Sequence, residues 1–519
     1  MRGIVFILLS SFLGFSSFTQ NNNLISTHPF FRDNLMFLYS NNSHAIPSML
    51  PALESVYYSE HPYVEFVVIN SFTRKKPFFK RTFSKHLVDI KKDDYHLSIS
   101  PVGELSIGND IFHAGNQLLF QNTRGLYVEG DLFRNFSFST SFYENQAVFS
   151  SYEKEFISTH GEFYTSNLGY TQQNGMVPGA ARTKPFKANG FDYAFAIGNF
   201  VYRPTNNFSI IAGNNQQFIG NGYRSMLLSD NNYGTPYLRL DYNLNSKWSF
   251  NLIRSRNMNL IRKKAYTTVE AYYQPKGFSA HYISFKPNEN MAFSFFEGSM
   301  WAMGDSLKTQ AVNPSYFIPI PLMAALFNNG KTYSIFGLNA NFNFFKKYLL
   351  YGQLVAGQLK NQFAVQVGAR AYNFFGLTNI MLQLEWNKAS KSMYIAENAR
   401  LSYSNYNLPV AHISGTGFNE FLCRINWSFK KFYIDLRSNN FILSNYTKTS
   451  LLPVMNSALP QNGMVFNQNV EVGMKFNKKL NLSVFSSLLW RKEMLDNTNV
   501  NLIFHLGIRT GLLSQPNDY

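Results

Sequence analysis

The stretch FIGNGYRSMLLSDN, residues 218–231, gathers glycine and polar residues that could do chemistry. Gly220 and Gly222 could shape a loop around a phosphate, because glycine-rich turns present backbone N–H groups to anions. The stretch lacks the glycine spacing and the Lys-Ser/Thr ending of a P-loop, and the residues after it predict another strand rather than a helix. The sequence therefore argues against a nucleotide site.

Ser225 and Ser229 are candidate nucleophiles of a serine hydrolase, such as an outer-membrane phospholipase. Neither lies in a G-x-S-x-G motif, no histidine is near them, and the ten histidines are scattered through the chain. A triad can be assembled from residues that are distant in sequence, so a hydrolase stays open as an alternative. With one cysteine (Cys423), no H-E-x-x-H and no Asp-rich calcium loop, we expect no metal and no other cofactor.

The same stretch offers a dense set of hydrogen-bonding groups. Sugars are bound by such mixed donors and acceptors, with aromatic rings against their apolar faces. The alternative is a buried polar network that packs a loop against the inside of a wall. The acid in the YENQ run at 143–146 is expected to pair with an inward-facing arginine. The predicted polysaccharide-binding set, or lumen polar network, comprises Asn221, Tyr223, Arg224, Ser225, Ser229, Asp230, Asn231, Arg124, Glu144 and Gln146.

Composition indicates the scaffold that positions these residues. Of the 519 residues only 15% are charged, 17% are aromatic (51 Phe and 31 Tyr among them), and the mean hydropathy is −0.19. Beyond residue 20 no apolar run approaches the length of a membrane-spanning helix. Such a chain must place its apolar residues alternately, which is typical of a transmembrane β-barrel.

Alternation is visible segment by segment. In SIFGLNANFNFF, residues 334–345, Phe336 and Leu338 share one face with further apolar residues, and Asn339 and Asn341 share the other. A period of two predicts a strand. The same pattern recurs at 363–370, 380–387, 470–476 and 500–509.

Connections alternate between short and long. Short basic or Asn-rich links predict tight hairpins on the periplasmic side, and long irregular stretches predict loops at the opposite end. Counting alternating segments from about 94 to 511 predicts an all-β fold, an antiparallel barrel of about 16–18 strands. The short links are 245–247, 345–347, 429–431 and 477–479, and the long stretches are 301–332, 388–418 and 441–464.

The N-terminal region differs from the predicted barrel, 93–519. Residues 1–20 place Arg2 before a short apolar run, which predicts a signal peptide. In 21–92, IPSMLPALESVYYSEH (46–61) and KPFFKRTFSKHLVDIKKDD (76–94) have helix-like spacing, with Pro47 or Pro51 suited to a helix start. We expect a small periplasmic or lumen-facing helical region, or alternatively an extended arm.

Charge suggests partners. The chain has 47 Lys and Arg against 30 Asp and Glu, a formal net charge of +17. An exported barrel does not meet nucleic acid, so outer-membrane lipid, lipopolysaccharide head groups and an anionic surface polysaccharide are the expected acidic partners, besides the insertion machinery of the outer membrane. The alternative is that the basic residues only decorate turns and the lumen.

Three stretches carry a resemblance to a known family: RGLYVEGDLFRNFSFSTSFYENQAVF (124–149), VPGAARTKPFKANGFDYAFAIGNFVYRP (177–204) and FIGNGYRSMLLSDNNYGTPYLRL (218–240). They resemble the Wzi-type capsule assembly barrels of the Gram-negative outer membrane, in particular the Bacteroidota branch that includes the gliding motility protein RemB. The resemblance implies a non-catalytic surface lectin that organises exported polysaccharide or supports gliding. A porin or substrate-specific channel is the alternative. GLLSQPNDY (511–519) departs from the usual terminal strand and predicts a variant insertion signal.

Overall fold

The computed structural model describes residues 24–42, 48–53, 86–112, 118–133, 135–166, 169–262, 273–303, 314–326, 331–454, 459–477, 480–511 and 515–519. The predicted signal peptide at 1–20 lies outside these residues. Residues 54–85 lie outside them as well.

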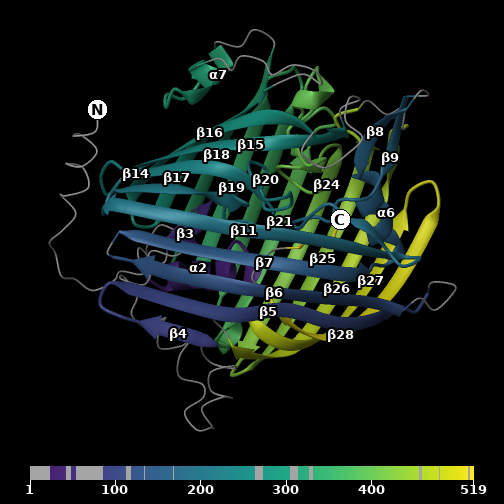
Figure 1. The fold of residues 1–519 in the computed structure, drawn as a ribbon, viewed down its shortest axis with the longest axis horizontal. Coiled ribbons are helices and arrows are strands. Elements are labelled where there is room, and N and C mark those ends of the chain that lie inside the picture. The colour runs from purple at the N-terminus through teal and green to yellow at the C-terminus, as the bar shows by residue number, and fades with distance from the viewer. Residues whose placement is uncertain are drawn as a thin grey trace, which may run out of the picture.

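The wall is a closed barrel of 18 antiparallel strands (Figure 1). It closes where β28 pairs with β5, from Ile503 opposite Asp110 to Arg509 opposite Glu104. The predicted fold class and strand number are thereby confirmed. The wall strands are β5 (Tyr95–Asp110), β6 (Leu118–Leu132), β7 (Phe136–Val148), β11 (Gly190–Thr205), β12 (Phe208–Asn215), β14 (Thr235–Asn243), β15 (Trp248–Arg262), β16 (Tyr273–Asn288), β17 (Met291–Ala302), β18 (Thr332–Phe344), β19 (Tyr348–Gly357), β20 (Phe363–Tyr372), β21 (Ile380–Ala389), β24 (Phe418–Phe429), β25 (Phe432–Tyr446), β26 (Gln461–Asn477), β27 (Leu482–Met494) and β28 (Thr498–Thr510).

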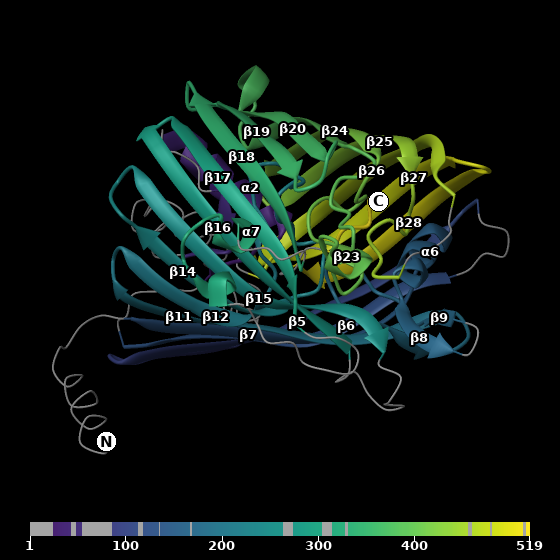
Figure 2. The same cartoon turned by 90° about the horizontal axis from the view of Figure 1, so that it is seen from above.

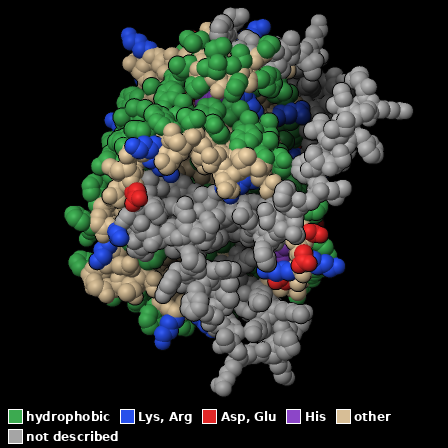
Figure 3. All heavy atoms as spheres, turned by 90° about the vertical axis from the view of Figure 1, so that its left-hand side faces the viewer, with side chains coloured by type: hydrophobic (Ala, Val, Ile, Leu, Met, Phe, Trp, Pro, Cys, Tyr) green, Lys and Arg blue, Asp and Glu red, His purple; other side chains and the backbone are tan. Residues whose placement is uncertain are grey.

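The alternation predicted from the sequence is the alternation of the wall. In β18, Leu338 is 56% exposed on the outside, whereas Asn339 and Asn341 are buried on the inside. Hydrophobic side chains occupy much of the rim of the face drawn in Figure 3. An apolar outer face suits lipid. The lumen buries polar residues of the wall together with an apolar cluster that includes Met226, Phe296 and Ile335.

Short turns and long loops lie at opposite ends of the barrel, as predicted. We call them the turn end, with links such as 244–247, 345–347 and 430–431, and the loop end, with 303–331 and 390–417. In bacterial outer-membrane barrels the short turns face the periplasm. Two of the loop-end stretches carry small helices, namely η2 (Pro314–Phe317) with α7 (Met323–Leu326), and η4 (Ala399–Leu401); η3 (Phe374–Gly376) lies in a turn.

Between β7 and β11 the chain leaves the wall at the loop end. It forms α6 (Ser151–Thr159), the hairpin of β8 (Glu162–Ser166) and β9 (Gly169–Gln173), and the short β10 (Lys184–Phe186), which pairs with β11. The hairpin extends from the barrel beside α6 (Figure 2).

The lumen is filled by segments of the chain itself, which we call the plug: residues 24–42, 48–53, 216–234, 390–417 and 515–519. Figures 1 and 2 show α2 (Pro29–Asn42) inside the ring of strands. Two short strand pairs hold plug segments to one another: β1 (Leu24–Ile25) with β3 (Ala52–Leu53), and β2 (Met49–Leu50) with β13 (Phe218–Ile219). Within segment 390–417, β22 (Ser404–Asn405) pairs with β23 (Leu408–Pro409).

The predicted positions of the N-terminal helices are wrong where the structure describes them. The described part of 46–61 forms β2 and β3, with Pro51 between them, and Pro47 lies outside the described residues. The described part of 76–94 forms β4 (Val88–Lys91), which pairs with β5 beyond the point where β28 ends. Open strand edges in the plug and the wall thus override local helical spacing. The helix instead begins at Pro29, a favoured first position.

A partly buried carboxylate fastens α2 to the wall. Asp33 accepts hydrogen bonds from Arg370 Nη1 on β20 at 2.8 Å and from Arg424 Nη1 on β24 at 2.5 Å. Burial alone would raise the pKa of Asp33, but the charges of Arg424 and Arg370 hold it below its ordinary value. Leu35 and Met36 pack nearby in an apolar cluster at the turn end.

Among the described residues no helix is both long enough and apolar enough to cross a membrane.

Asp33→Asn is expected to destabilise the barrel strongly, because it leaves two buried arginines without their shared anion. Breaking a buried ion pair costs on the order of 3 kcal/mol. The measurement is the urea midpoint of unfolding, followed by the gel mobility of folded and unfolded barrel. Asp93→Asn, at an exposed position before β5, is the control. Equal midpoints for both variants would show that Asp33 does not anchor α2.

Candidate functional site

Residues 218–231 lie inside the lumen, against the inner face of the wall. Apart from β13 the segment has no regular secondary structure, so its backbone groups need other partners. Wall side chains provide them. Met226 N–H donates to Gln353 at 2.7 Å, and the N–H groups of Tyr223 and Arg224 donate to Glu385 at 2.7 and 3.1 Å.

Four carbonyl groups of the segment are satisfied in the same way. Each accepts from a side chain of the wall or of the neighbouring plug segment 390–417. The pairs are Gln353 to Ile219 at 3.0 Å, Gln366 to Arg224 at 2.9 Å, Tyr394 to Met226 at 2.7 Å and Tyr403 to Leu227 at 2.9 Å.

Gly220 and Gly222 are explained by the closeness of the wall. Gly220 has φ +137°, and a Cβ there would lie 2.5 Å from Gln353 Nε2. A Cβ on Gly222 would lie 2.6 Å from Glu385 Oε2. The G-x-G spacing therefore lets the backbone approach wall side chains that bond to it. This geometry agrees with the sequence, which argues against a phosphate-binding loop.

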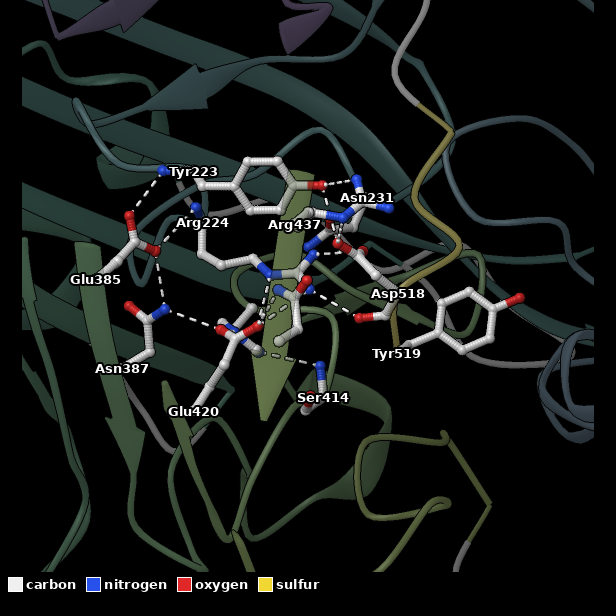
Figure 4. A network of polar contacts seen from close by, with 12 residues as sticks. Tyr223, Arg224, Asn231, Glu385, Asn387, Ser414, Glu420, Arg437, Asp518 and Tyr519 are labelled. Carbon is white, nitrogen blue, oxygen red and sulfur yellow. Dashed lines mark hydrogen bonds and ion pairs between the residues drawn. The ribbon is translucent and has the colours of Figure 1, made fainter. Parts of the chain in front are cut away.

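A buried charge network meets at Arg224 (Figure 4). Arg224 forms ion pairs with Glu420 of β24 at 3.2 Å and with Asp518 at 3.1 Å. Burial opposes its charge, but Asp518 and Glu420 raise the pKa of Arg224 above the ordinary value. Tyr223 donates to Asp518 at 2.9 Å and accepts from Arg437 of β25 at 2.7 Å. The network thus joins two plug segments to two wall strands.

His412 extends the network as a neutral ring. Its Nδ1 accepts from the Ser414 N–H at 3.1 Å, so Nε2 carries the proton and donates to Glu420 at 2.7 Å. Burial lowers the pKa of His412, in agreement with the neutral form. The ring orients the carboxylate of Glu420 toward Arg224.

The two candidate serine nucleophiles are engaged elsewhere. Ser225 Oγ donates to the Ile219 carbonyl at 2.5 Å, and Ser229 Oγ donates to Asp230 at 3.3 Å. Within the part of the chain that the structure describes, neither hydroxyl bonds to a histidine, and no group of three His, Cys, Asp or Glu could hold a metal ion. The geometry gives no support to a hydrolase at these serines.

Seven of the predicted site residues come together in the lumen. Besides the five described above, Asn221 accepts from Asn341 of the wall at 3.0 Å, and Asn231 donates to the Ala411 carbonyl at 2.6 Å. All but Tyr223 are buried. This burial favours the buried-network reading of the cluster over direct contact with a large polysaccharide.

Arg124, Glu144 and Gln146 do not join the cluster, and the expected inward direction of these side chains is wrong. Arg124 and Glu144 face each other across β6 and β7 on the outside of the wall, 3.7 Å apart and 60% and 52% exposed. The inward positions of β7 belong to the odd residues, such as Tyr143 and Asn145, because strand side chains alternate.

Sequence reasoning missed the partners of the cluster. Glu385 and Glu420 belong to the polar faces of β21 and β24, where alternation alone could have marked them as inward. Asp518 could not be found, because no pattern shows that residues 515–519 turn into the lumen. There Tyr519 stacks on Phe156 of α6 with ring centroids 3.9 Å apart.

Comparison with solved structures supports the fold. The chain is similar to Wzi of Escherichia coli, described as an outer membrane protein involved in group 1 capsule assembly and a carbohydrate-binding β-barrel: 12% identity, 94% of this chain and 98% of that chain covered, TM-score 0.55. OpdK, an outer membrane protein of Pseudomonas aeruginosa, matches with 10% identity, 79% and 97% coverage and a TM-score of 0.45. No protein-family profile and no curated protein matches the sequence.

The chain therefore shares the fold of Wzi, an outer-membrane barrel. The finer likeness to the gliding branch stays a prediction.

Gly220→Ala is expected to loosen the plug and lower the thermal midpoint of the barrel, because the new methyl group collides with Gln353. Gly169→Ala is the matched control: Gly169 also has a positive φ, +114°, but a Cβ there meets nothing within 4 Å. Both variants carry the backbone strain, so only the difference between their midpoints reports the collision. Equal shifts would mean that closeness to the wall does not fix the glycine.

Proposed function

We propose that the protein is a plugged, non-enzymatic outer-membrane barrel that binds surface polysaccharide at its loop end and so supports capsule or matrix assembly, or gliding. The observation that carries this proposal is the filled lumen, in which wall side chains bond directly to the plug backbone. A barrel occupied in this way acts through its surface rather than by conduction. The apolar outer face contacts lipid and lipopolysaccharide, and insertion requires the machinery of the outer membrane.

The loop end provides a suitable sugar-binding surface. The strand β9, with the sequence GYTQQ, is exposed along its whole length. Tyr170 is 44% exposed and offers a ring for the apolar face of a sugar, beside amide and hydroxyl groups that can bond to sugar hydroxyls. Wzi, which shares the fold, is described as carbohydrate-binding, and the net charge of +17 favours an anionic polymer.

Within this proposal the cluster around Arg224 and Asp230 holds the plug in place and shapes the loop end from below. Its effect on retention of polysaccharide is then indirect, through the position of the loops.

Tyr170→Ala is expected to lower retention of the cell's own acidic surface polysaccharide by several-fold, because it removes an exposed ring. The measurement is the amount of polysaccharide that stays on washed cells carrying equal amounts of folded barrel. Tyr242→Ala is the matched control, since Tyr242 is 43% exposed but lies near the turn end. Wild-type retention by Tyr170→Ala cells would contradict a role for β9.

A substrate-specific channel is the second candidate, and one observation favours it: a cavity of about 330 Å³ lies between the plug and the wall. Single-channel recording in planar bilayers separates the two functions. The plugged reading predicts no steady conductance for the full chain. Stable large openings would contradict it and support a channel.

A further inference from the structure

The cavity beside the plug lies between α2, residues 223–231 and segment 515–517 on one side and strands of the wall on the other. Its lining reaches the turn end at Lys475, Asn481 and Gly511. A volume of about 330 Å³ falls at the small end of the range for ligand sites, roughly 300–1,000 Å³. Most of the lining side chains are polar or charged, with rings from Tyr143, Tyr433 and Phe485 among them.

Arg32 of α2 projects from the plug into this lining. It is only 2% exposed, and its guanidinium lies 4.2 Å from the ring of Phe218. Nη2 donates to the Tyr223 carbonyl at 3.1 Å, whereas Nε and Nη1 have no hydrogen-bond partner in the described structure. Buried arginine donors without an acceptor are costly, so the geometry leaves room for an acceptor from a ligand.

Asp230, in plug segment 216–234, provides an acceptor in the cavity that the Arg32 donors line. It is buried, it lines the same cavity, and its Oδ2 has no hydrogen-bond partner among the described residues. Burial lowers the pKa of Arg32, and the charge of Asp230 acts in the opposite direction, in favour of the charged guanidinium. The cavity therefore offers both donors and an acceptor, as a ligand with a carboxylate and hydroxyl groups requires.

Both cations and acids line the turn-end part of the cavity, with Lys475 and Arg509 beside Glu104 and Glu471. His28, which precedes α2, has its pKa lowered to about 3 by burial and by the positive charges of Arg509 and Lys475. Arg509 is paired with Glu471 at 2.5 Å, and the Lys475 ammonium lies 3.4 Å from the centroid of the Phe30 ring.

We propose that this cavity binds an acidic sugar unit from the periplasmic side, with its carboxylate held by the unpartnered N–H groups of Arg32 and a ring hydroxyl donating to Asp230. The class of ligand rests on the proposed polysaccharide role, whereas the site is distinct from the loop-end surface. Such a site would let the barrel hold a sugar unit at the turn end as well as at the cell surface.

The test is isothermal titration calorimetry on the full chain in detergent, with D-galacturonate, D-galactose and inorganic phosphate at one ionic strength. Galacturonate should bind, and galactose, which lacks the carboxylate, should bind at least tenfold more weakly. No binding of galacturonate, or equal binding of galactose, would overturn the proposal. Phosphate that binds as tightly as galacturonate would overturn the sugar assignment in favour of a general anion site.

Arg32→Gln should weaken galacturonate binding at least tenfold. Arg254→Gln is the control, because Arg254 lies on the outer face of the wall opposite the exposed Leu238, bonds to the Ile318 carbonyl and lies outside the lining of this cavity. Gel mobility establishes that each variant is folded, and the wild-type comparison of galacturonate with galactose decides the question if Arg32→Gln does not fold. Unchanged affinity in folded Arg32→Gln would overturn the assignment.

The two proposals fail separately. If cells retain polysaccharide normally but the purified protein does not bind galacturonate, only the cavity site is ruled out. If galacturonate binds but cells with Tyr170→Ala retain polysaccharide normally, only the loop-end surface is ruled out.

Discussion

The structure depends on one constraint: an irregular segment inside a barrel must find a partner for each of its backbone polar groups. Residues 219–227 find many of them in the wall side chains Gln353, Gln366 and Glu385. Other plug groups, such as the hydroxyls of Tyr394 and Tyr403, provide the rest of those seen. A buried N–H or carbonyl without a partner costs free energy comparable to a lost hydrogen bond. The polar side chains on the inner face of the wall thus hold the plug backbone in position by hydrogen bonds. The segment has glycine at 220 and 222 because these wall side chains lie too close for a Cβ atom.

Charge extends the same logic across the lumen. Arg224, with Glu420 and Asp518, and Asp33, with Arg370 and Arg424, each join a plug segment to wall strands at low exposure. Buried ion pairs add little net stability compared with apolar packing, but the loss of one partner is costly. They therefore fix the position of the plug segments, because each charge is compensated only where it meets its partners. Plug and wall consequently behave as one folded unit, and this is the physical basis of the surface function proposed above.

The sequence predicted the wall well and the plug poorly, for physical reasons. Alternation in stretches such as 334–345 reflects the difference between lipid and lumen, a strong signal that each strand carries by itself. The region 46–61 failed because β2 pairs with β13, about 170 residues away, and local spacing contains no information about that partner. The prediction that Arg124 and Glu144 face the lumen is wrong because it used the chemistry of these residues and not the alternation of inward and outward positions along β6 and β7. The cluster at 221–231 was recognised, but its partner Asp518 depends on a turn of the chain that no local pattern records.

Hydrogen exchange tests the central claim most directly, because the account assigns specific wall acceptors to specific plug amides. The N–H groups of Tyr223, Arg224 and Met226 should exchange as slowly as amides of the neighbouring wall strands β19–β21, although their segment has no regular secondary structure. Exchange as fast as in the exposed turn at Phe375, which is 93% exposed, would contradict the account. It would show that the plug is a loop resting in the lumen and not part of the folded wall.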